Sequence, residues 1–374
     1  MKIMFLQLWH DMYGGAETVN HSLATQFKKD GYSVKVECLY KCHKNEIITD
    51  IDYEKEFISD ELRRPSYKIM LRNLLKLKLK SFITDTNKCI KVIQNKHKTN
   101  KILKEKIKEY NPDWIIVTNP EIIAEVPNEY LKKSLIHLHS GCEEYIKSKE
   151  LQKAKKVIYR YQNKVYRLIW LTKGFMDEGK KYGLTNGTYM YNPVRIKSNK
   201  ESSLDHHNII FIGRIAPQKR VYLLTEIFDT FQKENKKWNL NIYGSGSDNK
   251  IIMNENIHLH GPISDVKEKL LESDIFALTS SFEGFPMVVL EAYECGIPVI
   301  TFNFKTSCSE VVKDGETGFI VEMDNKEEYI AKLNKLCSDI ELRKKMGQNA
   351  KKYAQKFYPE TVAQRWYKLF KGEI

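Results

Sequence analysis

The sequence predicts an α/β protein built from two doubly wound domains, each with a parallel sheet. Short apolar runs alternate with longer helical stretches through both halves of the chain, which is typical of parallel strands joined by helical crossovers. The length of 374 residues exceeds the roughly 100–200 residues of one compact domain. A polar, proline-containing stretch near residues 190–208 separates the two series and is predicted to be an interdomain linker.

The first half of the chain contains five predicted strands with helices between them. One helix is expected over residues 15–31, because Gly31 stands where helices commonly end and glycine is favoured at that position. The strands occupy residues 2–8, 33–40, 114–119, 134–139 and 169–172.

The second half repeats this alternation. Helices are expected over residues 221–234 and 266–274, and the last segment, residues 359–374, is an amphipathic helix that begins at Pro359. Ligands of such sheets bind beyond the carboxyl ends of the strands, so a shared substrate is expected in a cleft between the domains. The strands occupy residues 208–214, 240–245, 257–262, 274–280, 298–303 and 318–322.

The composition argues against several other classes of protein. The apolar start reaches only His10 and Asp11, which is too short for the core of a signal peptide. No stretch approaches the roughly 18 uncharged apolar residues of a membrane-spanning helix, so a cytoplasmic location is expected. The seven cysteines are scattered and include no C-x-x-C pair, which indicates reduced thiols rather than a zinc site or disulfides.

Positive charge is concentrated in one part of the first half. The chain has a net charge of +13, and residues 63–108 alone hold 15 basic and 2 acidic side chains. One interpretation is a solvated pair of basic helices. The other is contact with an anionic membrane surface or an anionic acceptor, because clustered lysines attract phosphates and lipid head groups. Apolar residues interrupt the run, which favours a membrane surface, and no nucleic acid partner is expected.

Two cations follow the first strand of the second half. The strand ends at Arg214, and Lys219 follows five residues later at the head of a helix. Such residues are often merely solvated. Held in place, however, they could neutralise a diphosphate leaving group, as a metal ion does in other enzymes.

The most specific motif is the run EGFPMVVLE, which begins at Glu283 and ends at Glu291. A helix is expected to begin near Pro286, so the amide groups from Gly284 to Val288 can bind sugar hydroxyls or phosphate oxygens. Carboxylates accept paired hydrogen bonds from vicinal diols, so one glutamate could hold a sugar and the other a ribose. The alternative is a helix-capping Glu283 and a surface Glu291, but Glu291 lies among apolar residues, where an unpaired carboxylate would be costly.

Two histidines alternate along the strand at residues 134–139. A packed or hydrogen-bonded His137 is as good an explanation as a functional one, whereas His139 stands at the strand end. The sequence offers no third ligand for a metal, so no metal site is expected. Gly244-Ser245-Gly246 resembles a dinucleotide-binding fingerprint only in part, because Asn249 occupies the third glycine position, and hydride chemistry is not expected.

Together these motifs resemble the family-four glycosyltransferases of the GT-B fold. The resemblance covers most of residues 205–345, where five motifs occur in the family's order and spacing: FIGRIAPQKR, IYGSGS, LHGPI, SSFEGFPMVVLEAYECGIPVI and VVKDGETGFIV. The first half matches more thinly, through YGGAE at residues 13–17 and IHLHSG at 136–141. The sequence departs from the family's pattern at Cys308, where proline is common.

The resemblance implies two Rossmann-like domains facing a central cleft. Residues 1–190 would bind the acceptor and residues 205–358 the donor, with the C-terminal helix 359–374 packed back on the first domain. The reaction would be a retaining, metal-independent transfer, without a cofactor, from a UDP-linked hexose or N-acetylhexosamine. The acceptor would be a glycan, lipid-linked molecule or anionic polymer of cell-envelope polysaccharide, lipopolysaccharide or teichoic-acid biosynthesis. The enzyme would be cytoplasmic, or peripheral at the inner face of the membrane through residues 63–108.

The resemblance also assigns the site residues. Arg214 and Lys219 would contact the diphosphate, Glu283 and His139 the donor sugar, and Glu291 the ribose. The loop of Gly14 and Gly15 would face the phosphates and the acceptor. The full set comprises the catalytic residues His139, Arg214, Lys219 and Glu283 and the donor-binding residues Gly14, Gly15, Gly213, Gly244, Ile263, Gly284, Phe285, Pro286, Met287, Val288 and Glu291.

Retention in this family is described as same-face attack through a short-lived oxocarbenium-like state, in which the departing phosphate helps to deprotonate the acceptor. The sequence fits this description because it shows no pair of carboxylates with the separate acid and nucleophile roles of a glycosidase. Two alternatives remain open. One is a nucleotide-sugar epimerase or phosphorylase of the same fold. The other is a non-enzymatic glycan- or nucleotide-binding protein, against which the intact Arg214, Lys219 and glutamate pair argue.

Overall fold

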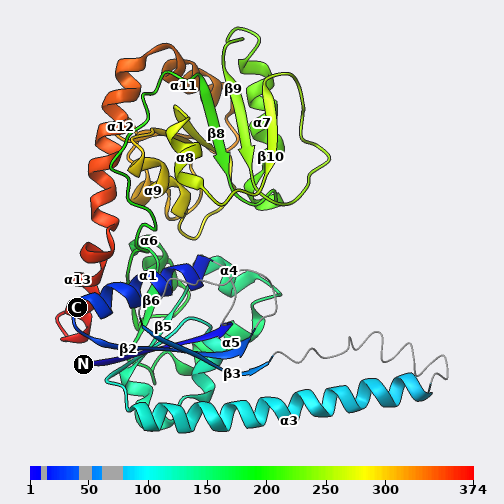
Figure 1. Cartoon of the computed structure of the whole chain (residues 1–374), viewed down its shortest axis with the longest axis vertical. Coiled ribbons are helices and arrows are strands. Elements are labelled where there is room, and N and C mark those ends of the chain that lie inside the picture. The colour runs from blue at the N-terminus through cyan, green and yellow to red at the C-terminus, as the bar shows by residue number, and fades with distance from the viewer. Residues whose placement is uncertain (10–14, 42–52, 61–78) are drawn as a thin grey trace. The chain divides into compact units, whose positions relative to one another are not determined.

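A computed structural model describes residues 1–9, 15–41, 53–60 and 79–374 of the chain. The chain divides into two compact units (Figure 1). The sheets are parallel and helices alternate with the strands, which confirms the predicted pair of Rossmann-like domains. The first unit comprises Met1–Leu138, Tyr145–Ile169 and Leu184–Gly187, and the second His139–Glu144, Trp170–Gly183 and Thr188–Ile374.

The first sheet has seven strands in the order β3-β2-β1-β4-β5-β6-β7, and its pairs from β3 to β6 are parallel. Residues 3–6 of its central strand β1 and 115–117 of the neighbouring β4 are fully buried, because helices cover a parallel sheet on both faces. The strands are β1 (Lys2–Trp9), β2 (Ser33–Lys41), β3 (Glu54–Asp60), β4 (Trp114–Val117), β5 (Ser134–His137), β6 (Arg167–Trp170) and β7 (Gly187–Tyr189).

The helices of this half of the chain include one that is unusually long. α3 (Leu79–Tyr110) holds 32 residues and contains residues 79–108 of the predicted basic segment, whereas residues 63–78 lie outside the described residues. α1 (Gly15–Lys29) packs through Phe27 against Phe5 of β1, with ring centroids 6.0 Å apart. The other helices are α4 (Cys142–Lys147), α5 (Gln152–Tyr161) and α6 (Lys173–Lys181), with the 3-10 turns η1 (Pro120–Glu125) and η2 (Asn128–Lys133).

The second sheet has six parallel strands in the order β10-β9-β8-β11-β12-β13, and Figure 1 shows β8, β9 and β10 side by side. The residues of β11 and β12 are all buried. The strands are β8 (Asn208–Ile212), β9 (Asn239–Tyr243), β10 (Ile257–Gly261), β11 (Ile275–Leu278), β12 (Val299–Phe302) and β13 (Gly318–Val321).

Helices of the second unit pack on one another as well as on its sheet. α7 contacts α11, and α9 contacts both α8 and α12. The buried hydroxyl of Tyr329 in α11 donates to the carbonyl oxygens of Leu278 and Ile300, which ties that helix to the sheet. The helices are α7 (Val221–Phe231), α8 (Val266–Leu271), α9 (Met287–Glu294), α10 (Cys308–Val311), α11 (Lys326–Ser338), α12 (Ile340–Ala354) and α13 (Pro359–Phe370), with η3 (Pro217–Lys219) and η4 (Gln355–Phe357).

All eleven predicted strands are present, although several end earlier than predicted. Two further strands were not predicted. β3 has the charged sequence EKEFISD, and an edge strand of this kind lacks the apolar run of a buried strand. β7 has only three residues. No helix in the described part of the chain is both long enough and apolar enough to cross a membrane.

Candidate functional site

The carboxyl ends of β8 and β9 meet through two glycines. The N–H of Gly213 donates to the carbonyl oxygen of Tyr243 at 2.9 Å. Gly244 has a φ of +154°, and a Cβ at this position would lie 1.7 Å from the carbonyl oxygen of Gly213. Glycine is therefore required at 244 for this direct backbone contact, which brings the two loops together at one edge of the sheet.

The turn after β8 carries the predicted cations. Its backbone is bound to the loop after β11, because the N–H of Ser281 donates to the carbonyl oxygen of Gln218 at 2.9 Å and Thr279 Oγ1 donates to that of Lys219 at 3.1 Å. The side chain of Arg214 is exposed, whereas that of Lys219 is largely buried. The turn thus places one cation at the surface and one inside.

Lys219 and Glu283 form an ion pair. Nζ of Lys219 lies 2.6 Å from Oε1 of Glu283, and the two side chains are 15% and 7% exposed. The chain carbon Cε of Lys219 passes over Gly213, at 3.7 Å from where a Cβ would stand. The cation predicted for the diphosphate and the carboxylate predicted for the sugar are therefore brought together, shielded from the solvent that weakens exposed pairs.

The backbone of His139 lies close to Gly284, the residue that follows Glu283. Its carbonyl oxygen would be 3.3 Å from a Cβ at Gly284, so glycine allows the close approach of the two segments. Burial lowers the pKa of His139 to about 3, so its imidazole is neutral at neutral pH. Burial raises the pKa of Glu144 in α4, and the charge of Glu283 raises it further, which places a second carboxyl group near the first.

The start of α9 differs in detail from the prediction. Pro286 is the N-cap residue and Met287 the first helical residue. Proline has no N–H, so Pro286 cannot donate to a ligand, and the amide donors of this run are restricted to its neighbours. The buried ring of Phe285 joins an aromatic cluster, with its centroid 5.8 Å from that of Tyr191 and 5.7 Å from that of Phe357. The side chain of Phe285 therefore anchors the loop that precedes α9.

Glu291 is deeply buried on α9, with 1% of its side chain exposed, so the alternative of a surface Glu291 is wrong. Nε and Nη2 of Arg195 both reach its Oε1. Its Oε2 is buried without a hydrogen-bond partner among the residues that the structure describes. Burial raises the pKa of Glu291, and Arg195 acts in the opposite direction. Sequence reasoning missed Arg195, whose only signal is a charge inside the predicted linker.

The remaining predicted residues lie in different places. Ile263 follows β10, whose last residue, Gly261, accepts the N–H of Gly244 at 2.8 Å, so Ile263 lies near the same sheet edge. Gly15 begins α1 in the first unit, and Gly14 lies outside the described residues. Cys308 is buried at the start of α10, and burial raises the pKa of its thiol to about 12.

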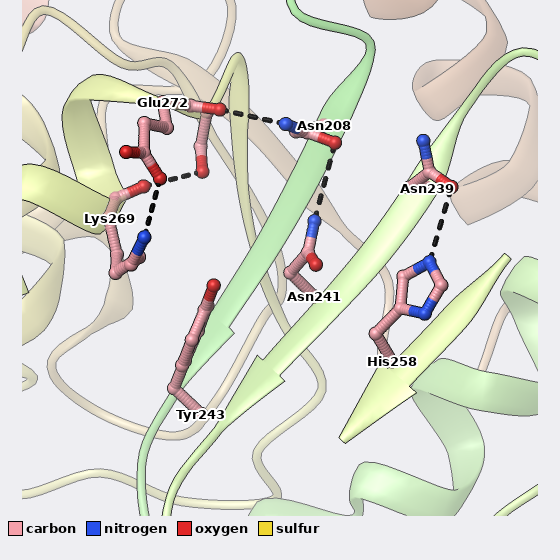
Figure 2. Close-up of a pocket in the computed structure, with 8 residues that line it drawn as sticks. Asn208, Asn239, Asn241, Tyr243, His258, Lys269 and Glu272 are labelled. Carbon is pink, nitrogen blue, oxygen red and sulfur yellow. Dashed lines mark hydrogen bonds and ion pairs between the residues drawn. The ribbon is translucent and has the colours of Figure 1, made fainter. Parts of the chain in front are cut away.

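A separate cavity of about 260 Å³ opens on the face of β8 and β9 (Figure 2). It contains none of the predicted site residues. Its polar groups bind one another: Asn208 donates to the carbonyl oxygen of Glu272 at 2.9 Å, and Lys269 pairs with the Glu272 carboxylate at 2.7 Å. We assign it no ligand. Among the described residues, no three His, Cys, Asp or Glu side chains are grouped to hold a metal ion.

Known proteins resemble this chain in both sequence and fold. Residues 195–353 match the family model described as Glycosyl transferases group 1. The chain is 30% identical over 168 residues to the amylovoran biosynthesis glycosyltransferase AmsD of Erwinia amylovora, a match that spans 43% of this chain and only 47% of AmsD. It is 24% identical over 361 residues to the lipopolysaccharide 1,6-galactosyltransferase of Salmonella typhimurium, with 90% of each covered.

A solved structure similar along the whole chain is that of HepE from Anabaena in complex with UDP-glucose. The TM-score is 0.73 at 16% sequence identity, and the comparison covers 100% of both chains. Residues 195–353 thus match the group 1 glycosyl transferases, and the fold of the whole chain is that of the GT-B glycosyltransferases.

Proposed function

We propose that this chain is a retaining, metal-independent glycosyltransferase that moves a sugar from a UDP-sugar to a glycan or lipid-linked acceptor of the cell envelope. The observation that carries the proposal is the shielded pair of Lys219 and Glu283 at the carboxyl edge of the second sheet, where the backbone of His139 lies close to Gly284, the residue after Glu283. Cation, carboxylate, neutral imidazole and free backbone amides suit a ligand that is both anionic and rich in hydroxyl groups.

We assign the binding of the diphosphate leaving group to the two cations, Lys219 and Arg214. As the glycosidic bond breaks, negative charge grows on the diphosphate, and fixed cations stabilise that charge without reorganisation. Lys219 would exchange part of its contact with Glu283 for a phosphate oxygen, and Arg214 would approach from the exposed side of the turn. The amide groups at the start of α9 add partial positive charge near Met287 and Val288.

We assign the binding of the donor sugar to Glu283 and His139. The carboxylate can accept from two neighbouring hydroxyls, and the neutral imidazole can orient a third. With a pKa of about 3, His139 is a poor base for the acceptor hydroxyl at neutral pH. We therefore assign the departing phosphate oxygen as the group that takes the proton of the acceptor hydroxyl. The acceptor then attacks from the same face of the sugar that the phosphate leaves, so the anomeric configuration is retained.

The nucleotide and the acceptor are inferred from relatives. HepE binds UDP-glucose, which supports a UDP-sugar donor here, with Glu291 on the ribose. AmsD acts in amylovoran biosynthesis, and the Salmonella relative acts on lipopolysaccharide, which supports an envelope acceptor. Residues 79–108 of the basic segment lie in α3, a long helix that would face the anionic inner surface of a membrane.

The test is a panel of nucleotide sugars incubated with the protein in EDTA, first without acceptor. UDP-sugars should raise the melting temperature and be slowly hydrolysed, and sugars linked to other nucleotides should do neither. Epimerisation of the sugar without acceptor would instead identify an epimerase. If no nucleotide sugar binds, or if turnover requires a divalent cation, the proposal is wrong in its donor or in its metal independence.

A further inference from the structure

The carboxylate of Glu291 is held from one side only. Two nitrogens of the Arg195 guanidinium converge on Oε1, while Oε2 is buried with no hydrogen-bond partner in the described part of the chain. A buried carboxylate oxygen without a donor is costly. Such an oxygen is tolerated where a ligand supplies the missing donor.

The position of Arg195 is set by its backbone. The N–H of Val194 donates to the carbonyl oxygen of Phe357 at 2.7 Å, and the N–H of Ser198 donates to Glu294 at 3.3 Å. Phe357 lies in η4, whereas Glu294 follows Glu291 by three residues on α9, so the backbone is held at η4 before Arg195 and at α9 after it. The side chain of Arg195 is 24% exposed, so one edge of the pair remains open to the surface.

We propose that Arg195 is a positioning residue for the nucleotide, which holds Oε1 of Glu291 and leaves Oε2 for the ribose hydroxyls of the donor. This inference rests on the proposed function, in which Glu291 binds the ribose. Arg195 itself touches the carboxylate and not the ligand. Its second effect is to keep Glu291 charged, because a protonated carboxyl group would present a hydroxyl donor where an acceptor is needed.

The experiment compares nucleotides that differ by one hydroxyl. Calorimetric titrations with UDP, 2′-deoxy-UDP and 3′-deoxy-UDP are made on the wild type and on Arg195→Ala, Arg195→Lys, Glu291→Gln and Lys197→Ala. Lys197 is the matched control, since it is a nearby cation in the same segment and pairs with Glu360 at 2.6 Å. Thermal melts establish that each variant is folded.

The wild type should bind UDP about tenfold or more tighter than at least one deoxy nucleotide. Arg195→Ala should lose this preference and bind the deoxy nucleotide about as tightly as the wild type does, because only the hydroxyl contact depends on Arg195. Arg195→Lys keeps the charge and should retain part of the preference. This variant provides the test if Arg195→Ala does not fold. Lys197→Ala should match the wild type.

Two results would overturn the role of Arg195. One is an unchanged preference in Arg195→Ala. The other is tighter UDP binding by that variant, since the guanidinium would then be competing with the ribose. Glu291→Gln separates this inference from the proposed function: if the wild type shows no preference and Glu291→Gln binds UDP normally, the ribose assignment itself fails. If Glu291→Gln loses the preference while Arg195→Ala keeps it, only the role of Arg195 fails.

Discussion

Nζ of Lys219 lies 2.6 Å from Oε1 of Glu283, and the pair joins the turn after β8 to the loop before α9. The same two loops are bound through their backbones by the bond from Ser281 N–H to the Gln218 carbonyl oxygen. Because the backbone already fixes both loops, the ion pair is not the only contact that shapes the site. Its removal should therefore change chemistry far more than folding.

Lys219→Ala or Glu283→Ala should abolish sugar transfer while the protein stays folded. Loss of one fixed charge at a developing charge costs about 10²–10³ in turnover. The free energy of unfolding should fall by about 1–3 kcal/mol, because the remaining partner is buried without its counter-charge. Steady-state turnover and circular dichroism are the measurements.

The control for that prediction is Lys326→Ala. Lys326 pairs with Glu226 at 2.7 Å, and both side chains are well exposed, so loss of this pair should cost at most about 1 kcal/mol and leave turnover unchanged. Near-normal turnover in Lys219→Ala or Glu283→Ala would show that the site is assigned wrongly.

Gly244→Ala should destabilise the second unit by about 3 kcal/mol or more. Its Cβ would lie 1.7 Å from the carbonyl oxygen of Gly213, a backbone atom that cannot rotate away. Gly261→Ala is the matched control, because its φ is also positive, at +78°, but no atom lies within 4 Å of the added Cβ. That variant should lose only about 1–2 kcal/mol. Urea denaturation measures both, and equal losses would contradict the close approach.

The strands and the motif loops could be predicted from sequence because local patterns determine them. β8 and β11 are apolar runs, and the burial of Glu291 follows from its apolar neighbours within one helix. The partner of Glu291 could not be predicted. Arg195 reaches it because hydrogen bonds hold Val194 to Phe357 of η4 and Ser198 to Glu294 of α9, and such contacts depend on tertiary packing.

The direction of one predicted ligand residue was equally hidden in the sequence. Phe285 lies between Gly284 and Pro286, and nothing in the local sequence determines which way its ring points. Its partners, Tyr191 and Phe357, are distant in sequence. β3 was missed for a different reason. It is an edge strand with a charged sequence, so it lacks the apolar run by which buried strands are predicted.

Phe285→Ala should lower both stability and nucleotide affinity. Removing a buried ring costs about 3–5 kcal/mol, and the loop that presents the Gly284 and Met287 amides loses its anchor. Phe285→Leu retains most of the volume and should recover much of both losses. Urea denaturation and UDP titration measure the two effects. If Phe285→Ala weakened UDP binding with no change in stability, the ring would be a direct ligand contact instead.

The last prediction concerns pH and a buried carboxylate of the first unit. The Glu37 side chain is 0% exposed on β2, with Lys106 of α3 at 3.1 Å and Lys35 at 3.4 Å. Burial raises the pKa of Glu37 above its ordinary value of 4.5, and the two lysines oppose this. The native state therefore binds a proton more readily than the unfolded chain, so stability falls as pH rises from the unfolded pKa through the folded pKa.

Lys106→Met should raise the folded pKa of Glu37 further, at about 1.4 kcal/mol per pKa unit, and so lose more stability at pH 8 than at pH 5. The double variant Lys106→Met/Glu37→Gln should lack this excess, and equal losses at both pH values in the single variant would show that Glu37 does not depend on Lys106.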